Sequence, residues 1–215
     1  MLIVFDLDDT LIDTSGTITP YKFRCIMDLF EQEKIFLPQD AAVQLAQLNE
    51  QCNNTKDAVR IFLERYSAAH LFSKAMEIYI APLPKDFFIP TTPGAQKVIK
   101  LFKRKKITMA LVTGGAYSFQ REKLEKAGFE PSIFSKIAIP EDSIKGPHYK
   151  ALLKEFSTFP HDAMVVGDRV RMDLAPAYDL GMKTIHMRWG RGLREQTEKW
   201  IDHSITSLEE LVEQV

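Results

Sequence analysis

The chain begins with a short apolar segment that ends abruptly in acidic residues. Residues 2–5 read Leu-Ile-Val-Phe, and residues 6–10 read Asp-Leu-Asp-Asp-Thr. Four β-formers in a row predict a buried strand, and side-chain alternation on an extended backbone would point Asp6 and Asp8 to the same side. Carboxylates this close repel one another in a partly dry site, so the pattern favours a cation between them over a plain polar turn.

A second acidic strand end is expected much later in the chain. Residues 163–166, Ala-Met-Val-Val, predict another short buried strand, and Gly167 and Asp168 follow it directly. Asp173 is expected to open a helix that ends at Gly181, and it can serve as the N-cap of that helix, beside a metal, or both. Ligands of open α/β sheets bind outside the carboxyl ends of the strands. The two acidic strand ends therefore predict one shared site.

Two further strand ends carry groups that can bind an anion. Residues 107–112 predict a strand that leads into Thr113 and Gly114, which offer a hydroxyl and backbone N–H groups. Lys145 comes just before a helix expected over residues 147–156. Taken singly, a Thr-Gly-Gly segment is usually only a turn and a lysine is usually a solvated surface group. Thr113, Gly114 and Lys145 indicate an anion site only in combination with the acids at the other two strand ends.

Taken in order along the chain, these groups resemble the motifs of the haloacid dehalogenase superfamily. The matching residues are Asp6-x-Asp8-x-Thr10, Thr113, Lys145 and Gly167-Asp168-x-x-x-x-Asp173. Residues 120–124, Gln-Arg-Glu-Lys-Leu, are a weaker family-like stretch. Dehalogenases of the superfamily lack the second acid of the first motif, whereas its phosphatases and phosphomutases have it. The presence of Asp8 therefore points to phosphoryl transfer.

The resemblance implies a doubly wound, Rossmann-like α/β core with a mostly parallel sheet and a smaller all-helical cap domain. Residues 1–14 and 89–215 would form the catalytic core, and residues 15–88, which show helical spacing, would form the cap. Core strands are expected near residues 2–5, 107–112, 133–139, 163–166, 183–187 and 203–205. Cap helices are expected over residues 21–34, 41–53 and 56–79, with Thr19 capping the first and a break near His70. Ser207 and Glu210 predict a capping box for the last helix.

The resemblance also implies a Mg²⁺-dependent phosphohydrolase that cleaves a small phosphomonoester through an aspartyl-phosphate intermediate. Asp6 would be the nucleophile. Asp8 would protonate the leaving oxygen and then deprotonate the attacking water, with a pKa that crowding by Asp6 and Asp9 is expected to raise.

The remaining motif residues would bind the metal and the phosphate. Asp6, the backbone carbonyl of Asp8, and Asp168 are the expected ligands of Mg²⁺, and Asp173 would join them or orient a metal-bound water. Thr113, Gly114 and Lys145 would hold the phosphoryl oxygens.

Composition agrees with an ordinary soluble enzyme of the cytoplasm, and the resemblance implies that its partner is a small phosphorylated metabolite. A formal net charge of −1 favours neither nucleic acid nor an anionic membrane, and no apolar segment approaches the ~20 residues that a membrane span needs. Two cysteines are too few for a disulfide framework, so a reducing compartment is expected.

Three other classes stay open at this point. A phosphomutase would keep the same motifs and transfer the phosphoryl group back. A non-catalytic Mg²⁺-binding phospho-regulatory protein would bind without turnover. A response-regulator receiver also uses an acid pair, a Thr and a Lys, but the order of the motifs and the chain length argue against it. The sequence indicates neither the physiological substrate nor the oligomeric state.

Overall fold

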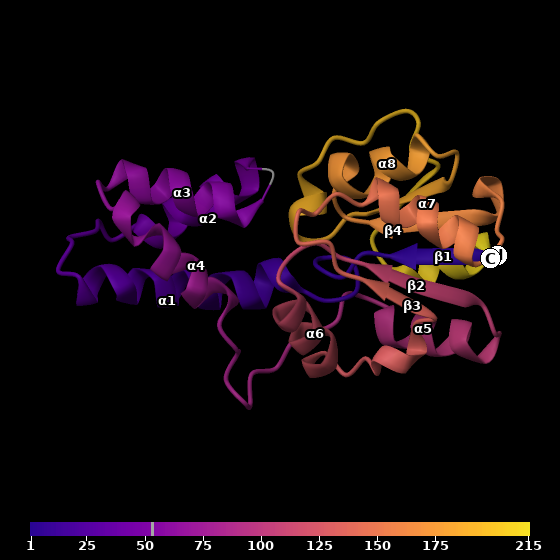
Figure 1. The fold of residues 1–215 in the computed structure, drawn as a ribbon, viewed down its shortest axis with the longest axis horizontal. Coiled ribbons are helices and arrows are strands. Elements are labelled where there is room, and N and C mark those ends of the chain that lie inside the picture. Colours follow the sequence, from indigo (N-terminus) through magenta and orange to yellow (C-terminus); the bar gives the residue numbers. More distant parts are fainter. Residues whose placement is uncertain (53) are drawn as a thin grey trace. The chain divides into compact units, whose positions relative to one another are not determined.

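The computed structural model describes residues 1–52 and 54–215 and divides the chain into two compact units (Figure 1). The first, which we call the α/β unit, consists of Met1–Ser15 and Pro84–Val215. The second, which we call the helical unit, consists of Gly16–Leu83.

The α/β unit is built on a six-stranded sheet with the order β3-β2-β1-β4-β5-β6, in which every neighbouring pair is parallel. Its strands are β1 Leu2–Phe5, β2 Thr108–Val112, β3 Lys136–Ala138, β4 Ala163–Gly167, β5 Lys183–Met187 and β6 His203–Ile205. The predicted α/β fold with a parallel sheet is confirmed. Strand β3 is shorter than the predicted 133–139, because Pro131–Ile133 forms a 3₁₀ turn before it.

Strand β1 occupies the middle of the sheet, where all four of its residues are buried. Leu2 pairs with Thr108 of β2 on one side and with Ala163 of β4 on the other. The chain proceeds from β1 to β2 and β3 and then crosses to β4, so the strand order reverses between β1 and β4. In a doubly wound sheet this reversal creates a crevice at the carboxyl ends of the two strands, which is where Asp6 and Asp168 follow.

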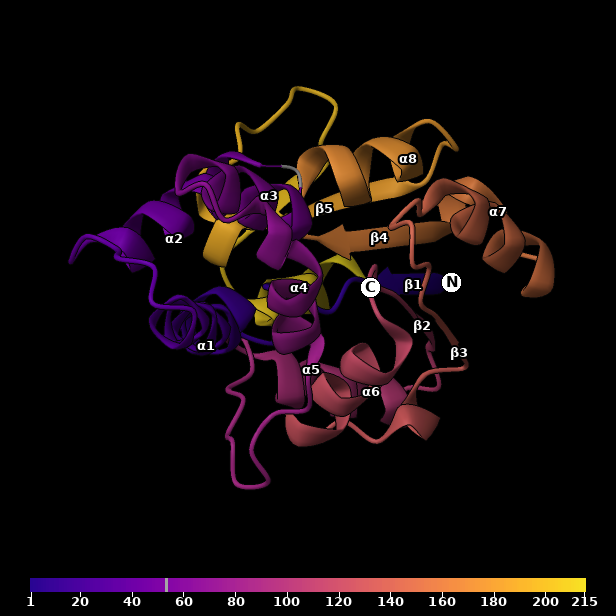
Figure 2. The same ribbon diagram turned by 60° about the vertical axis from the view of Figure 1, so that its left-hand side comes forward.

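Helices cover both faces of this sheet: α7 and α8 lie on one face, and α5 and α6 lie on the other (Figure 1, Figure 2). Their bounds are α5 Ala95–Arg104, α6 Tyr117–Lys126, α7 Gly146–Glu155 and α8 Ala175–Tyr178. Tyr149 and Leu152 of α7 pack against Leu2 and Val4 of β1 in one buried cluster. Burial of such side chains stabilises the fold by about 1.5–3 kcal/mol each, and this packing fixes the strand ends that carry the acids.

The last helical segment, Leu208–Gln214, is a 3₁₀ helix with the predicted capping box. Ser207 Oγ accepts a hydrogen bond from the backbone N–H of Glu209, and Glu210 Oε1 accepts one from the backbone N–H of Ser207. This part of the prediction is confirmed.

The helical unit contains α1 Thr19–Gln32, α2 Ala41–Gln51, α3 Thr55–Arg65 and α4 Phe72–Ile80. The prediction that Thr19 caps α1 is wrong: a π-helical turn over Thr14–Ile18 leads straight into the helix, and Thr19 is its first residue. A break between α3 and α4, with a 3₁₀ turn at Ala69–Leu71, matches the one expected near His70. The predicted end of the second helix at Asn53 lies outside the described residues.

A buried lysine in the helical unit hydrogen-bonds to carbonyl groups at the end of α4. Lys22 is 2% exposed, and its Nζ donates hydrogen bonds to the carbonyl oxygens of Ile78 and Ala81 at 3.2 and 2.5 Å. The last carbonyls of a helix lack partners within the helix, so Lys22 satisfies those at the end of α4. None of the helices in the described residues is both long and apolar enough to span a membrane.

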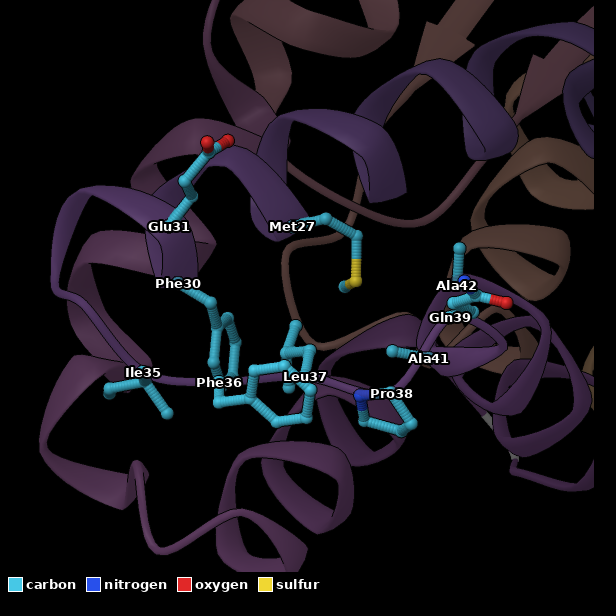
Figure 3. A pocket seen from close by; sticks show the side chains of 10 residues that line it. All are labelled: Met27, Phe30, Glu31, Ile35, Phe36, Leu37, Pro38, Gln39, Ala41 and Ala42. Atoms are coloured by element: carbon cyan, nitrogen blue, oxygen red, sulfur yellow. The ribbon is translucent and has the colours of Figure 1, made fainter.

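The helical unit also has a pocket of about 350 Å³, formed by the second half of α1 and the segment that leads into α2 (Figure 3). It is lined by Met27, Phe30, Glu31, Ile35, Phe36, Leu37, Pro38, Gln39, Ala41 and Ala42. The lining is largely apolar and carries no cationic group. A phosphate site is therefore not expected there.

Candidate active site

A tight turn follows β1 and places the acids of the first motif. The backbone N–H of Asp6 still bonds to the carbonyl of Val166, continuing the pairing with β4, at 2.9 Å. Asp9 then adopts a left-handed conformation with φ 57°, and its N–H bonds to the carbonyl of Ile12. The buried Asp9 carboxylate accepts hydrogen bonds from the backbone N–H and the hydroxyl of Ser15. These contacts fix the loop that holds Asp6 and Asp8.

Three of the predicted acids come together in a buried cluster. Asp6, Asp168 and Asp173 are 5%, 1% and 1% exposed, and each offers a carboxylate oxygen within 4.8 Å of the others. Lys145 Nζ lies among them and donates hydrogen bonds to Asp6 Oδ1 at 2.5 Å and to Asp173 Oδ1 at 2.6 Å. Residues from the ends of β1 and β4 and from the start of α7 thus meet in the crevice.

The backbone around Asp173 differs from the prediction. Asp173 does not open a helix; it lies within a π-helical turn, Val170–Leu174, that leads into α8. Helical backbone begins three residues earlier than expected because the Asp173 N–H already bonds to the carbonyl of Arg169, while Asp173 Oδ2 accepts the Arg169 N–H at 2.9 Å. Gly181, with φ 77°, does follow α8 as expected.

Gly167 leaves room for this arrangement. A Cβ atom at Gly167 would lie 2.5 Å from both Cβ and Oδ2 of Asp173. We expect Gly167→Ala to force Asp173 away from Lys145 and to lower the free energy of unfolding by about 1–3 kcal/mol, the usual cost of overpacking. Gly146→Ala is the control, because a Cβ there would meet only Pro176 at 3.6 Å. Denaturant unfolding measures the free energy of unfolding of both variants. If Gly167→Ala were as stable as Gly146→Ala, this role for Gly167 would be ruled out.

The Asp8 carboxylate binds a different set of side chains. Oδ1 accepts hydrogen bonds from Lys123 Nζ at 2.8 Å and from the Thr14 hydroxyl. Oδ2 accepts from Lys123 Nζ at 3.0 Å and from Gln120 Nε2 at 2.9 Å. Burial alone would raise the pKa of Asp8, but the Lys123 charge and these hydrogen bonds lower it to about 2. The expected rise in the pKa of Asp8 is therefore wrong for this state of the protein.

The phosphate-binding candidates lie at the end of β2. The Thr113 N–H bonds to the carbonyl of Ala138 at the end of β3, which fixes the start of the loop. Gln120 Nε2 lies 2.7 Å from Thr113 Oγ1 and 2.6 Å from the carbonyl oxygen of Gly114. A Cβ at Gly114 would collide with the side chain of Ser143, so the loop needs glycine there.

Sequence reasoning assigned no role to Gln120 and Lys123. Both belong to the family-like stretch 120–124, and residues three apart share one face of a helix. Two polar residues on one face of the helix that follows a candidate phosphate-binding strand end are the signal that could have found them.

Charge in the buried cluster is unbalanced. Burial raises the pKa of Asp6, as do the neighbouring Asp173 and Asp8, against the lowering effect of Lys145. Burial and then Asp173 and Asp9 raise the pKa of Asp168 well above its ordinary value. For Lys145, the two carboxylates outweigh burial and raise its pKa. Fully ionised, the three carboxylates and the one ammonium would carry two negative charges in a dry site, and the raised pKa values of Asp6 and Asp168 show that this state is unfavourable without a cation.

A divalent cation fits this charge and these donors. Asp168 Oδ2 is buried and has no hydrogen-bond partner among the residues that the structure describes. Buried polar atoms are nearly always paired, and Mg²⁺ prefers carboxylate, carbonyl and water oxygens. The cluster of Asp6, Asp168 and Asp173 is therefore suited to hold Mg²⁺.

A protein-family model described as a haloacid dehalogenase-like hydrolase matches residues 1–181. The chain belongs to this family. One curated relative is the glyceraldehyde 3-phosphate phosphatase of Pyrococcus furiosus. This hydrolase is 28% identical to it over 220 residues, and the alignment covers 99% of this chain and 91% of the relative. It is 26% identical over 219 residues to the protein of that name in Methanocaldococcus jannaschii, covering 98% and 95%. A phosphoserine phosphatase of Thermus thermophilus is 29% identical over half of this chain and 43% of its own length.

Solved structures share the fold of this hydrolase. The HAD-hydrolase YfnB of Bacillus subtilis, bound to magnesium in its crystal, has a TM-score of 0.72 and 21% identity, covering 99% of this chain and 97% of its own. A phosphoglycolate phosphatase predicted in Haemophilus somnus has a TM-score of 0.76 and 16% identity, covering 99% and 96%. The predicted family, the α/β fold and the hydrolase class are confirmed.

Residues beyond the family match also support the site of this hydrolase. Glu195 accepts hydrogen bonds from Arg169 Nε at 2.5 Å and from the backbone N–H of Val170 at 2.6 Å. His186 Nε2 lies 3.1 Å from the carbonyl oxygen of Asp168. These contacts hold the backbone at Asp168 and directly after it, and no sequence motif had pointed to them.

Proposed function

We propose that this hydrolase is a Mg²⁺-dependent phosphatase that cleaves a small phosphomonoester through an aspartyl-phosphate on Asp6. The observation that carries the proposal is the buried group of Asp6, Asp168, Asp173 and Lys145 at the ends of β1 and β4. Phosphatase activity in the broad sense follows from the family match together with the phosphatases among the relatives.

In the first step, an Asp6 oxygen attacks the phosphorus, and the bond to the leaving oxygen breaks. Lys145 holds the Asp6 carboxylate in place, and together with the Thr113 hydroxyl and the Gly114 N–H it balances charge on the phosphoryl oxygens. Asp8 first takes up a proton from solvent, which the negative charge of the bound phosphate favours and the Lys123 charge opposes, and then gives it to the leaving oxygen. In the second step, ionised Asp8 takes a proton from the water that hydrolyses the aspartyl-phosphate.

The carboxylates of Asp6 and Asp168 and the backbone carbonyl of Asp8 would hold Mg²⁺. Both oxygens of Asp173 already accept hydrogen bonds, from Lys145 and from the Arg169 N–H. Asp173 therefore acts through Lys145 or through a metal-bound water rather than as a direct ligand. When bound, the ion would neutralise charge on the phosphoryl group and orient it for in-line attack.

The helical unit serves as a cap that excludes water and selects the substrate. Support comes from the chain connection, since Thr14 and Ser15 hydrogen-bond to Asp8 and Asp9 immediately before the helical unit begins at Gly16. Closing over a phosphorylated substrate would protect the aspartyl-phosphate from bulk solvent.

A cap that selects the leaving group gives a measurable pattern. The core motifs contact the phosphoryl group, which all phosphomonoesters share, so discrimination must come mainly from the cap. Among alanine substitutions of exposed polar residues throughout the helical unit, those that meet the substrate should change the ranking of substrates by kcat/KM, whereas Lys103→Ala on α5 should not. Equal scaling of all substrates in every cap variant would place specificity elsewhere.

A phosphate-release assay with Mg²⁺ over a panel of phosphomonoesters tests the function. The panel contains glyceraldehyde 3-phosphate and phosphoserine, which the relatives' names suggest, with sugar phosphates, phosphoglycolate and nucleoside monophosphates. We expect free phosphate from at least one small substrate. Isomerised sugar phosphate without free phosphate would indicate a phosphomutase, and no turnover of any compound would indicate a non-catalytic regulator.

A further inference from the structure

Helix α6 carries two buried polar side chains that the proposed chemistry does not use. Gln120 and Lys123 are 3% and 4% exposed. Their spacing of three puts them on one face of α6, the helix that follows the Thr113–Gly114 loop. Burying an amide and an ammonium is costly unless they are paired, so their partners indicate their purpose.

Lys123 contacts both oxygens of one carboxylate. Its Nζ lies 2.8 Å from Asp8 Oδ1 and 3.0 Å from Oδ2, and the two side chains are only 5% and 17% exposed. The ammonium also lies 4.7 Å from the centre of the Phe119 ring. Because the Lys123 ammonium contacts both oxygens, it fixes the orientation of the Asp8 carboxylate and also balances its negative charge.

Gln120 joins the same carboxylate to the phosphate-binding loop. Its Nε2 lies within hydrogen-bond distance of three acceptors: Asp8 Oδ2, Thr113 Oγ1 and the Gly114 carbonyl oxygen. An amide nitrogen carries two hydrogens, so the three bonds cannot all be complete at once. Gln120 Oε1 is buried and has no hydrogen-bond partner in the described part of the chain.

The direction of the Gln120–Thr113 bond has a chemical consequence. Because Thr113 Oγ1 accepts a hydrogen from the amide, the Thr113 hydroxyl can direct its own hydrogen to another acceptor. A phosphoryl oxygen bound beside the Thr113–Gly114 loop is such an acceptor. The same amide nitrogen thus orients the phosphate donor and the acid/base carboxylate.

We propose that Gln120 and Lys123 are positioning residues that couple the acid/base group Asp8 to the phosphate-binding loop at Thr113 and Gly114. The proposal rests on the phosphatase function above and adds to it a link through α6. Lys123 sets the orientation of Asp8. Gln120 shares its two hydrogens between Asp8 and the loop, so that the two halves of the site are arranged together.

This coupling predicts the kinetics of Lys123→Met. Lys123 acts through Asp8 and not on the substrate, so kcat should fall by roughly 10²-fold, as expected for a misplaced catalytic group, with KM little changed. The loss should be greater for alkyl phosphates than for aryl phosphates, whose leaving groups need less protonation. Arg121→Met on the same helix is the matched control, because its pairing with Glu125 is at the surface.

A double-mutant cycle with Asp8→Asn gives the decisive comparison. If Lys123 works through Asp8, Lys123→Met should change kcat by no more than about threefold once Asp8 is already Asn, because contacting residues are strongly non-additive. The proposal is overturned if Lys123→Met behaves like Arg121→Met, or if its effect is the same in both backgrounds. Because Asp6→Asn tests the phosphatase chemistry separately, failure of the cycle in an active, Asp6-dependent enzyme concerns only the coupling.

A second variant covers the case in which Lys123→Met does not fold, since it leaves a buried carboxylate without its cation. Gln120→Leu removes the amide without unpairing a charge, and the same cycle applies to it. Here kcat should fall at least tenfold with a rise in KM, because the Thr113 hydroxyl loses its orientation as well. Unchanged kcat and KM in Gln120→Leu would refute the link between Asp8 and the loop.

Discussion

We expect Asp6→Asn to lower phosphatase turnover by at least ~10³-fold, because an amide is a far poorer nucleophile than a carboxylate. The substitution keeps the size of the side chain, and Lys145 keeps its 2.6 Å contact with Asp173, so the fold is expected to persist. Steady-state phosphate release, with far-ultraviolet circular dichroism of the same samples, measures both expectations.

Asp179→Asn is the matched control, since Asp179 is an exposed acid of the α/β unit. We expect its turnover to stay within about twofold of the starting protein, as for surface substitutions away from a site. A folded Asp6→Asn protein with near-normal turnover would remove Asp6 from the role of nucleophile.

We expect removal of the proposed Mg²⁺ to have the second large effect. Without a cation, ionised carboxylates of Asp6, Asp168 and Asp173 would repel a phosphate dianion, so excess chelator should abolish turnover and added Mg²⁺ should restore it. Ca²⁺ should substitute poorly, because it prefers more ligands and looser geometry. Full turnover in excess chelator would contradict the metal site.

The same site can be measured without turnover. A ligand that binds only the folded state raises the unfolding temperature, so Mg²⁺ should raise the Tm of the protein. Asp168→Asn, which changes the carboxylate with the unpaired oxygen, should largely lose this shift, whereas Asp179→Asn should keep it. An equal shift in both variants would place the ion elsewhere.

Much of the fold could be predicted because its signals are local. Short apolar runs such as residues 2–5 and 163–166 predict buried parallel strands. A glycine such as Gly181 predicts that a helix ends just before it, because glycine readily adopts the left-handed conformation found there. The carboxyl ends of parallel strands share one edge of the sheet, so the sequence alone is enough to expect Asp6 and Asp168 near each other.

The environment of Asp8 could not be predicted in this way. Crowding by Asp6 and Asp9 suggested a raised pKa, but the partners that decide it, Gln120 and Lys123, lie 112 and 115 residues further along the chain. The spacing of Gln120 and Lys123 predicts that they share one face of a helix. It does not predict which residue that face contacts. The charge of the buried Lys123, together with the hydrogen bonds from Lys123, Thr14 and Gln120, lowers the pKa of Asp8 instead of raising it.

Two helix beginnings were also beyond local reasoning. Thr19 and Asp173 are residue types that favour N-caps, yet both lie inside helical backbone, because π-helical turns extend each helix toward the N-terminus. The Asp173 carboxylate instead contacts Lys145, which lies 28 residues earlier in the chain.

Trapping the phosphorylated enzyme tests the central claim most directly. Asp8→Asn should slow hydrolysis of the intermediate, while an aryl phosphate still phosphorylates the protein because its leaving group needs little protonation. After mixing with Mg²⁺ and the aryl phosphate, the sample is quenched in acid and reduced with borohydride, which converts an aspartyl-phosphate to homoserine, and its peptides are identified by mass spectrometry. We predict homoserine at position 6; no reduced residue, or reduction at another acid, would contradict the mechanism.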